Sequence, residues 1–173
     1  YVYNFVDRYG QPQYWRDIGT RDAYYQSHMD LLGRDPAFNL YDRYWPVRTY
    51  HEQYPPIKTV TTANSKSRLA NSIVSAGCWV EGGLVTNSVL SPNVTLLERA
   101  QVSDSILMEG VVVGEGSKIR NAIIDKQVVV PPNTKIGYHA AEDRKHFVLT
   151  SSGIVIVPKR TAVGKVIERK KEL

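Results

Sequence analysis

The chain of 173 residues is long enough for one domain, or for one domain and part of another. Its formal charge of +5 is concentrated after residue 137, where there are eight basic and four acidic residues, and this placement argues against a broad nucleic-acid-binding face. We expect a cytoplasmic protein without a membrane span, because the sequence has no long apolar run, no signal-peptide pattern and a single cysteine.

The first 54 residues are rich in aromatic side chains and contain ten of the eleven tyrosines. Alternating β-formers predict a strand over residues 1–6, and a turn is predicted over residues 8–12. Thr20 matches a helix N-cap and Gly33 a helix end, so a helix is predicted over residues 21–32. Its buried face is expected to contain Tyr24, Tyr25, His28, Met29, Leu31 and Leu32. His28 is therefore interpreted as a packing residue.

The loop before this helix reads YWRDIGT over residues 14–20. Its Asp17 has two interpretations. The carboxylate could bind a divalent metal and through it orient a phosphate-bearing ligand. It could instead cap or brace the loop, and spacing alone favours this second interpretation.

Pro55 and Pro56, followed by a polar stretch, predict a linker over residues 55–68. A repeat begins at residue 69. Its motif is an aliphatic residue, a variable residue, Asn or Asp, Ser or Ala, and two aliphatics. Copies start at residues 69, 85, 102 and 119, in steps of 16, 17 and 17 residues.

Aliphatic columns keep this step and lie five or six residues apart, so three sides make one coil of about 17 residues. The columns comprise Leu69, Val74, Val80, Val85, Leu90, Leu96, Val102, Leu107, Val113, Ile119, Ile124, Val130 and Ile136. The Asn or Asp of each copy suits a left-handed corner. The pattern predicts a mainly β protein with a parallel β-helix, and a β-sandwich with regular turns is the alternative. Cys78 is expected in the core or wall of the repeat.

The sequence argues against two other functions of the repeat. The run Gly114–Lys118 is glycine-rich, but it lies within the repeat and contains an acidic residue, so its glycines are expected to form corners and not a phosphate cradle. β-Helix acyltransferases generally use a histidine as general base. No histidine lies between residues 69 and 136, which argues against acyl transfer.

After the repeat, residues 140–147 predict a short helix and residues 153–157 a strand. The last segment, residues 158–173, is a basic tail.

Several strings together identify a resemblance. They are YWRDIGT, DAYYQSHMDLL, NLYDRYWPVRTY, PPIKTV, NSIVSAGCWVEGG, AIIDKQVVVPPNTKIG and AEDRKHFVLTSSGIVIVPK. The chain closely resembles the C-terminal portion of bacterial glucose-1-phosphate adenylyltransferase, also called ADP-glucose pyrophosphorylase. The resemblance implies that residues 1–54 are the α/β end of a nucleotidyltransferase domain. After the linker, residues 69–157 are then a left-handed, hexapeptide-like β-helix domain for regulation and assembly.

The resemblance also implies a reaction: ATP and glucose 1-phosphate give ADP-glucose and pyrophosphate, with Mg²⁺, for glycogen synthesis. Asp17 takes the catalytic and metal-binding role of the family's WRD motif, and Trp15 and Arg16 lie beside it. The family's Gly-rich nucleotide loop and basic pair have no match in this sequence. We therefore expect the 173-residue chain alone to be inactive.

Members of the family bind anionic effectors, such as fructose 1,6-bisphosphate or adenylates, between the β-helix and the catalytic domain. The matching basic positions are Lys126, Lys159 and the adjacent Arg160; the alternative is that all three are solvated surface charges. A homotetramer is also implied. The competing function is that of a non-catalytic β-helix regulatory or interaction protein. A hexapeptide-repeat acyltransferase is a third and weaker alternative.

Overall fold

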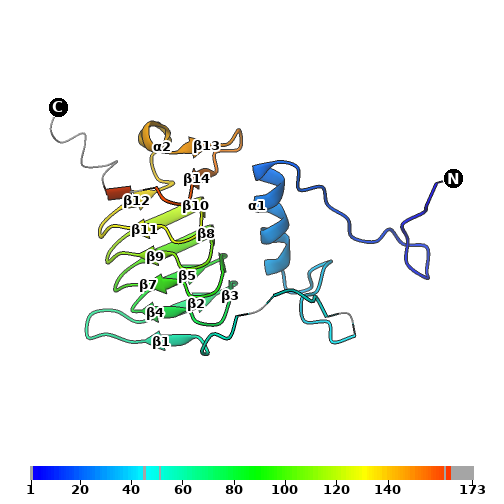
Figure 1. Ribbon diagram of the computed structural model, residues 1–173, viewed down its shortest axis with the longest axis horizontal. Coiled ribbons are helices and arrows are strands. Elements are labelled where there is room, and N and C mark those ends of the chain that lie inside the picture. Colours follow the sequence, from blue (N-terminus) through cyan, green and yellow to red (C-terminus); the bar gives the residue numbers. More distant parts are fainter. Residues whose placement is uncertain (1, 45, 51, 162, 165–173) are drawn as a thin grey trace.

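The computed structural model describes residues 2–44, 46–50, 52–161 and 163–164. Figure 1 shows a stack of short strands with one helix, α1 (Arg21–Met29), standing beside it along the stacking direction. The predicted basic tail lies largely outside the described residues, which end at Gly164.

The stack is built from two sheets. One side is a five-stranded parallel sheet of β1 (Lys58–Val60), β4 (Trp79–Glu81), β7 (Thr95–Leu96), β9 (Val112–Val113) and β11 (Val129–Val130). The other two sides share a nine-stranded sheet of β2 (Arg68–Ala70), β3 (Ile73–Val74), β5 (Leu84–Thr86), β6 (Val89–Leu90), β8 (Gln101–Leu107), β10 (Lys118–Ile124), β12 (Lys135–Ile136), β13 (Val148–Leu149) and β14 (Val155–Val157). The first sheet takes one strand from each of five coils, which confirms the predicted parallel β-helix.

The strand register confirms the predicted 17-residue step. Val85 lies opposite Val102, Val102 opposite Ile119, and Ile119 opposite Ile136 on successive coils. From Val80 onward, every predicted column residue is at most 1% exposed, so the columns form one continuous core. Leu69 is 36% exposed because it lies in the first coil, at the open end of the stack. Cys78 is buried in the core, and burial raises the pKa of its thiol.

Each coil turns at three left-handed corners, of which the sequence predicted the Asn/Asp corner of every copy and one glycine corner within residues 114–118. The Asn/Asp column has φ of 46–49° at Asn71, Asn87, Asp104 and Asn121. A second column has positive φ at Gly77, Asn93, Gly110 and Gln127, and a third at Gly82, Arg99, Gly116 and Asn133. Arg99 and Gln127 are not residue types that favour this conformation, so the register of neighbouring coils, not local preference, holds them there.

A ladder of serine hydroxyls, from the half-buried Ser72 to the buried Ser88 and Ser105, connects the coils beside the first corner. The Oγ of Ser72 accepts the N–H of Ser88 at 3.1 Å, and the Oγ of Ser88 accepts the N–H of Ser105 at 3.2 Å. The Oγ of Ser105 in turn accepts the N–H of Ala122 at 3.2 Å. Each hydroxyl also donates to the carbonyl two residues before it, so each serine both donates and accepts a hydrogen bond through its side chain.

The structure differs from two expectations near the N-terminus. The predicted linker over residues 55–68 also contains β1, which pairs with β4 and forms the first rung of the β-helix. The strand predicted over residues 1–6 is wrong for the described residues 2–6, where a single bridge joins Val6 to Pro12 across the predicted turn. Among the described residues no neighbouring strand completes a ladder there.

The predicted helices are confirmed. Thr20 caps α1 by accepting the N–H of Ala23 at 3.1 Å, and the last turn tightens into a 3₁₀ helix, η1 (Asp30–Leu32). A second helix, α2 (Ala140–His146), covers the final coil together with β13 (Figure 1). Within the described residues no helix is both long enough and apolar enough to cross a bilayer.

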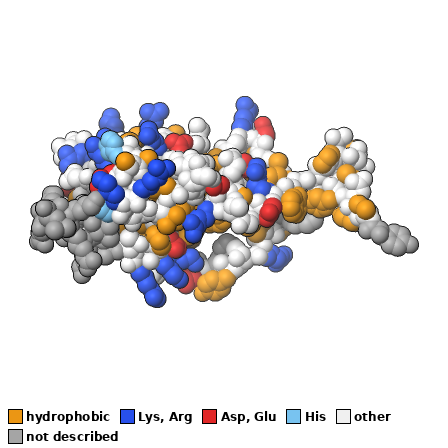
Figure 2. Space-filling view, turned by 90° about the horizontal axis from the view of Figure 1, so that it is seen from above, with side chains coloured by type: hydrophobic (Ala, Val, Ile, Leu, Met, Phe, Trp, Pro, Cys, Tyr) orange, Lys and Arg blue, Asp and Glu red, His pale blue; other side chains and the backbone are white. Residues whose placement is uncertain are grey.

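Apolar side chains of the first 50 residues are unusually exposed. Val2, Tyr3, Tyr9, Trp15, Tyr41, Tyr44 and Tyr50 are each at least 73% exposed. Figure 2 shows hydrophobic side chains along the arm that extends toward the N-terminus. Exposed apolar surface of this extent is typical of a segment that packs against further protein.

Candidate functional site

Helix α1 packs on an outward-facing aliphatic column of the β-helix. The last residue of each repeat motif points inward, whereas the aliphatic residue just before it points outward and builds this column. The column consists of Ile73, Val89, Ile106, Ile123 and Ile156, and α1 and η1 contribute Tyr24, Tyr25, Met29 and Leu32. The sequence motif contained this signal as a pair of aliphatics, but the outward member was not recognised as a docking surface. We call the contact between α1 and this column the seam.

Polar contacts fix α1 in place along the seam. The Tyr25 hydroxyl donates to the Asp104 carbonyl at 2.7 Å, and burial raises the pKa of Tyr25 to about 12. At the start of α1, Asp22 accepts hydrogen bonds from the hydroxyls of Ser152 and Thr150, which lower the pKa of the Asp22 carboxyl. These contacts anchor both ends of a helical turn to the β-helix, so the loop before α1 has a defined position relative to the coils.

That loop carries the predicted catalytic residues. Trp15 is 75% exposed, and the Arg16 guanidinium forms an ion pair with Asp30. The Oδ1 atom of Asp17 accepts the N–H of Gly19 at 3.0 Å, so this carboxylate does brace its loop. Its Oδ2 atom has no hydrogen-bond partner among the described residues and remains able to bind a ligand.

Two of the three predicted effector residues are neighbours in space. Ile124 at the end of β10 lies opposite Val157 at the end of β14, so Lys126 and Lys159 follow the paired strand ends by two residues each. The Asp125 carboxylate ties the two corners together. Its Oδ1 accepts the N–H of Lys126 at 2.7 Å, and its Oδ2 accepts the N–H of Lys159 at 3.1 Å. Asp125 was missed by sequence reasoning, because its partner in the second corner is 34 residues away.

Lys126, Lys159 and Arg160 are all exposed. Arg160 follows Lys159 directly and has a left-handed backbone with φ of 64°. The Asp125 clamp therefore presents a pair of lysines on adjacent corners, with an arginine next to them. Such a cluster suits an anion with more than one charged oxygen.

A groove of about 390 Å³ opens where the Asp17 loop meets the β-helix. One wall comes from Ile18, Gly19, Thr20, Arg21 and Tyr24, and the other from Met108, Ile123, Asp125 and Ile156. We call it the seam groove. Asp125 lies in its wall and also holds Lys126 and Lys159, so the groove and the lysine pair form one continuous region.

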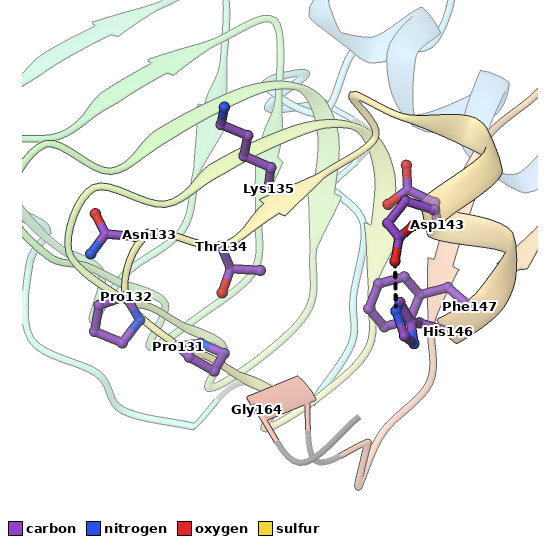
Figure 3. Close-up of a pocket in the computed structure, with 10 residues that line it drawn as sticks. Pro131, Pro132, Asn133, Thr134, Lys135, Asp143, His146, Phe147 and Gly164 are labelled. Carbon is purple, nitrogen blue, oxygen red and sulfur yellow. Dashed lines mark hydrogen bonds and ion pairs between the residues drawn. The ribbon is translucent and has the colours of Figure 1, made fainter. Parts of the chain in front are cut away.

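A second cavity, of about 490 Å³, lies at the last coil under α2 (Figure 3). Thr134 and Lys135 of the coil line it together with Asp143, His146 and Phe147 of the α2 segment. The Nε2 atom of His146 lies 3.3 Å from Glu142, and Asp143 accepts the N–H of Gly137 at 3.1 Å. None of the residues that line this second cavity was predicted as a site residue.

The glycine-rich run Gly114–Lys118 forms a corner. A Cβ atom on the buried Gly114 would lie 2.5 Å from the backbone nitrogen of Pro132 in the next coil, and Gly116 has φ of 66°. These glycines permit close stacking of coils, in agreement with the expected structural role.

Comparison with known proteins gives a consistent result. The chain is 54% identical over 168 residues to the glucose-1-phosphate adenylyltransferase of Anaeromyxobacter dehalogenans, covering 92% of this chain and 41% of the relative. It is 45% identical over 159 residues to that of Koribacter versatilis, covering 91% of this chain and 38% of the relative. It is 39% identical over 168 residues to glucose-1-phosphate adenylyltransferase 1 of Vibrio parahaemolyticus, covering 95% of this chain and 42% of the relative.

The chain thus spans about two fifths of the length of these relatives, and the similarity confirms the resemblance described above. A family model described as GlmU-like, C-terminal hexapeptide, matches residues 55–157. This range begins just before β1 and ends with β14, so it coincides with the β-helix of the structure. With its five-coil parallel β-helix matched from the first strand to the last, the chain belongs to the family of GlmU-like C-terminal hexapeptide proteins.

Proposed function

We propose that the protein carrying this chain is a glucose-1-phosphate adenylyltransferase, which makes ADP-glucose and pyrophosphate from ATP and glucose 1-phosphate for glycogen synthesis. The observation that carries this proposal is the similarity to enzymes of that name over at least 91% of the chain. The exposed apolar side chains of the first 50 residues support it, because they offer a surface for the rest of a catalytic domain. A non-catalytic β-helix interaction protein, the alternative, leaves the docked Asp17 loop without a role.

Mg²⁺ is the cofactor that we propose for the complete enzyme, with Asp17 as its ligand in this chain. The free Oδ2 of Asp17 is an oxygen donor of the kind that Mg²⁺ prefers. The described residues contain no cluster of three or more potential metal ligands, and one carboxylate fits an ion that keeps waters and binds substrate phosphates. When bound, Mg²⁺ supplies charge neutralisation at the phosphates. Trp15 and Arg16 flank this position, and the Asp30 ion pair orients Arg16.

Pyrophosphate release with ATP and glucose 1-phosphate tests this proposal. The longer protein should be active, and Asp17→Asn should lower its kcat by at least about 100-fold, because a neutral amide binds Mg²⁺ poorly. Asp42→Asn is the matched control, since the Oδ1 of Asp42 makes the same kind of bond to the N–H two residues on, at 2.8 Å. The 173-residue chain alone should form no ADP-glucose. Activity in the isolated chain, or equal loss in both variants, would contradict the assignment.

The β-helix is proposed to regulate the enzyme by binding an anionic metabolite. Lys126 and Lys159 supply the charge, Arg160 adds a guanidinium that can bind phosphate through two N–H groups, and the Asp125 clamp sets the spacing of the lysines. Their position next to the seam groove supports an effector that acts on the Asp17 loop.

Calorimetric titration of the chain with fructose 1,6-bisphosphate tests the regulatory site. Lys126→Ala and Lys159→Ala should each weaken binding by about tenfold, the effect of losing one charge-assisted hydrogen bond. Lys66→Ala, which removes an exposed lysine from another part of the chain, should leave the affinity unchanged. Equal affinity of all three variants would show that the predicted lysines are only solvated surface charges.

We also propose that the five-stranded side mediates self-association in a homotetramer. Its outward column contains Trp79, Val112 and Val129, of which Val129 is 59% exposed, and Lys58 lies over the Trp79 ring at 4.7 Å. The same column also contains Lys58 and Thr95, and exposed Trp and Val side chains among such residues are typical of a subunit contact. Sedimentation of the longer protein should show tetramers that Val129→Glu dissociates. Unchanged sedimentation of this variant would place the contact elsewhere.

A further inference from the structure

The wall of the seam groove opposite Asp125 contains an arginine that the resemblance does not assign. Arg21 is the first residue of α1, lines the groove and is exposed. No carboxylate among the described residues lies within 4.0 Å of its guanidinium. By contrast, the nearby Arg16 is paired with Asp30. Arg21 therefore presents an uncompensated charge at the groove.

The charges that face the groove come from both of its walls. Arg21 belongs to the α1 side, and Asp125 belongs to the β-helix side. Both carboxylate oxygens of Asp125 already accept backbone N–H groups, which reduces the repulsion that this residue exerts on an anion. Lys126 directly follows Asp125, and Lys159 is held to it by the second of these bonds. The backbones of both lysines are thus fixed beside the groove wall that contains Asp125, and Arg21 belongs to the other wall.

We propose that Arg21 completes the anion site from the opposite wall and couples it to the Asp17 loop. Only Ile18, Gly19 and Thr20 separate Arg21 from Asp17, and all three line the groove. The N–H of Gly19 is the group that braces Asp17. An anion bridging Arg21 and the lysine pair fixes this short segment against the β-helix and so sets the position of the Asp17 carboxylate. This inference rests on the anion site proposed above and adds a route by which the site acts.

The groove also defines the chemistry of its ligand. Ile18, Tyr24, Met108, Ile123 and Ile156 provide an apolar lining between the charged ends. A ligand with a carbon body and at least two phosphates, one toward Arg21 and one toward the lysines, uses both features. Inorganic phosphate has neither the length nor the body, so it should bind much more weakly.

Titration of the 173-residue chain with fructose 1,6-bisphosphate tests the role of Arg21. We expect Arg21→Gln to weaken binding at least about tenfold and Arg21→Lys to restore part of it, because a lysine keeps the charge but not the two-pronged geometry. Arg34→Gln, which removes an exposed arginine beyond the other end of the helix, is the matched control and should bind like the unaltered chain. Inorganic phosphate should bind to the unaltered chain at least about tenfold more weakly than the bisphosphate. Arg21→Gln should change the affinity for inorganic phosphate little.

Hydrogen exchange provides the readout for coupling. Saturation with the bisphosphate should slow exchange at residues 18–21 in the unaltered chain, and this slowing should be absent in Arg21→Gln even at saturation. If Lys126→Ala weakens binding but Arg21→Gln does not, the coupling inference is overturned while the anion site stands. If the unaltered chain binds no bisphosphate, the anion site itself fails, and with it the role of Arg21.

Discussion

The serine ladder leads to a prediction for Ser105→Ala. Ser105 is fully buried, its Oγ donates to the Ser103 carbonyl at 2.6 Å, and it accepts the N–H of Ala122 at 3.2 Å. Alanine fits the site, since Ala122 occupies the equivalent position one coil later. The variant therefore loses hydrogen bonds without a steric change, and it leaves the buried N–H of Ala122 without its acceptor.

The free energy of unfolding should fall by about 1–3 kcal/mol, the usual cost of a buried polar group that loses its partner. Urea denaturation, followed by circular dichroism, measures this as a lower midpoint with an unchanged slope. Ser103→Ala is the control, because the Ser103 side chain makes no hydrogen bond among the described residues. This variant should lower the free energy of unfolding by less than about 0.5 kcal/mol. Equal midpoints for Ser105→Ala and Ser103→Ala would show that the Ser105 hydroxyl does not stabilise the fold.

Three further predictions concern the seam and the corners. Tyr25→Phe removes the bond to the Asp104 carbonyl and should weaken docking of α1 by about 1 kcal/mol, measured as faster hydrogen exchange of the helix; unchanged protection would contradict this. Hydrogen bonds lower the pKa of Asp22 in the folded chain below its ordinary value of 3.8. The Asp22 carboxylate therefore stabilises the fold at pH values above 3.8, and this stabilisation is lost as the pH falls through the pKa of the folded state. Denaturation between pH 5 and about pH 2 should therefore depend less on pH in Asp22→Asn, and an identical pH profile would rule this out. Gly137→Ala places a Cβ atom 1.6 Å from the Arg120 carbonyl oxygen, at a residue with φ of 83°. Thermal denaturation should show a free energy of unfolding that is lower by about 3 kcal/mol or more. Gly10→Ala, where φ is 77° and the added Cβ atom meets open space, should lower it by only about 1 kcal/mol.

The β-helix was predictable because the same positions of every coil are buried in the core and therefore carry aliphatic residues at a fixed period. Val85, Val102 and Ile119 occupy one column, and each must be aliphatic to fill the core between stacked coils. The first corner was predictable as well, since Asn and Asp favour the left-handed conformation. Arg99 and Gln127 show why the other corners were not: the stacked register imposes their positive φ against local preference. The left-handed sense of the coil stays a prediction from the resemblance.

The candidate site was less accessible to sequence reasoning. Lys126 and Lys159 were named from the resemblance, but the reason for their proximity, the Asp125 carboxylate, joins residues far apart in the chain. The linker prediction failed to include β1 because a three-residue strand at the end of a stack carries only one inward residue and no visible repeat. The docking column was present in the sequence as the outward aliphatic of each motif, and only the packed position of α1 reveals its use.

We have proposed that the β-helix influences the Asp17 loop by binding an anion at the seam. A crystal structure of the chain grown with fructose 1,6-bisphosphate tests this claim most directly. We expect a ligand in the seam groove with one phosphate about 3 Å from the Lys126 and Lys159 ammonium groups and the other facing Arg21. A bisphosphate bound outside the groove, or an empty groove at concentrations that saturate the calorimetric titration, would contradict it.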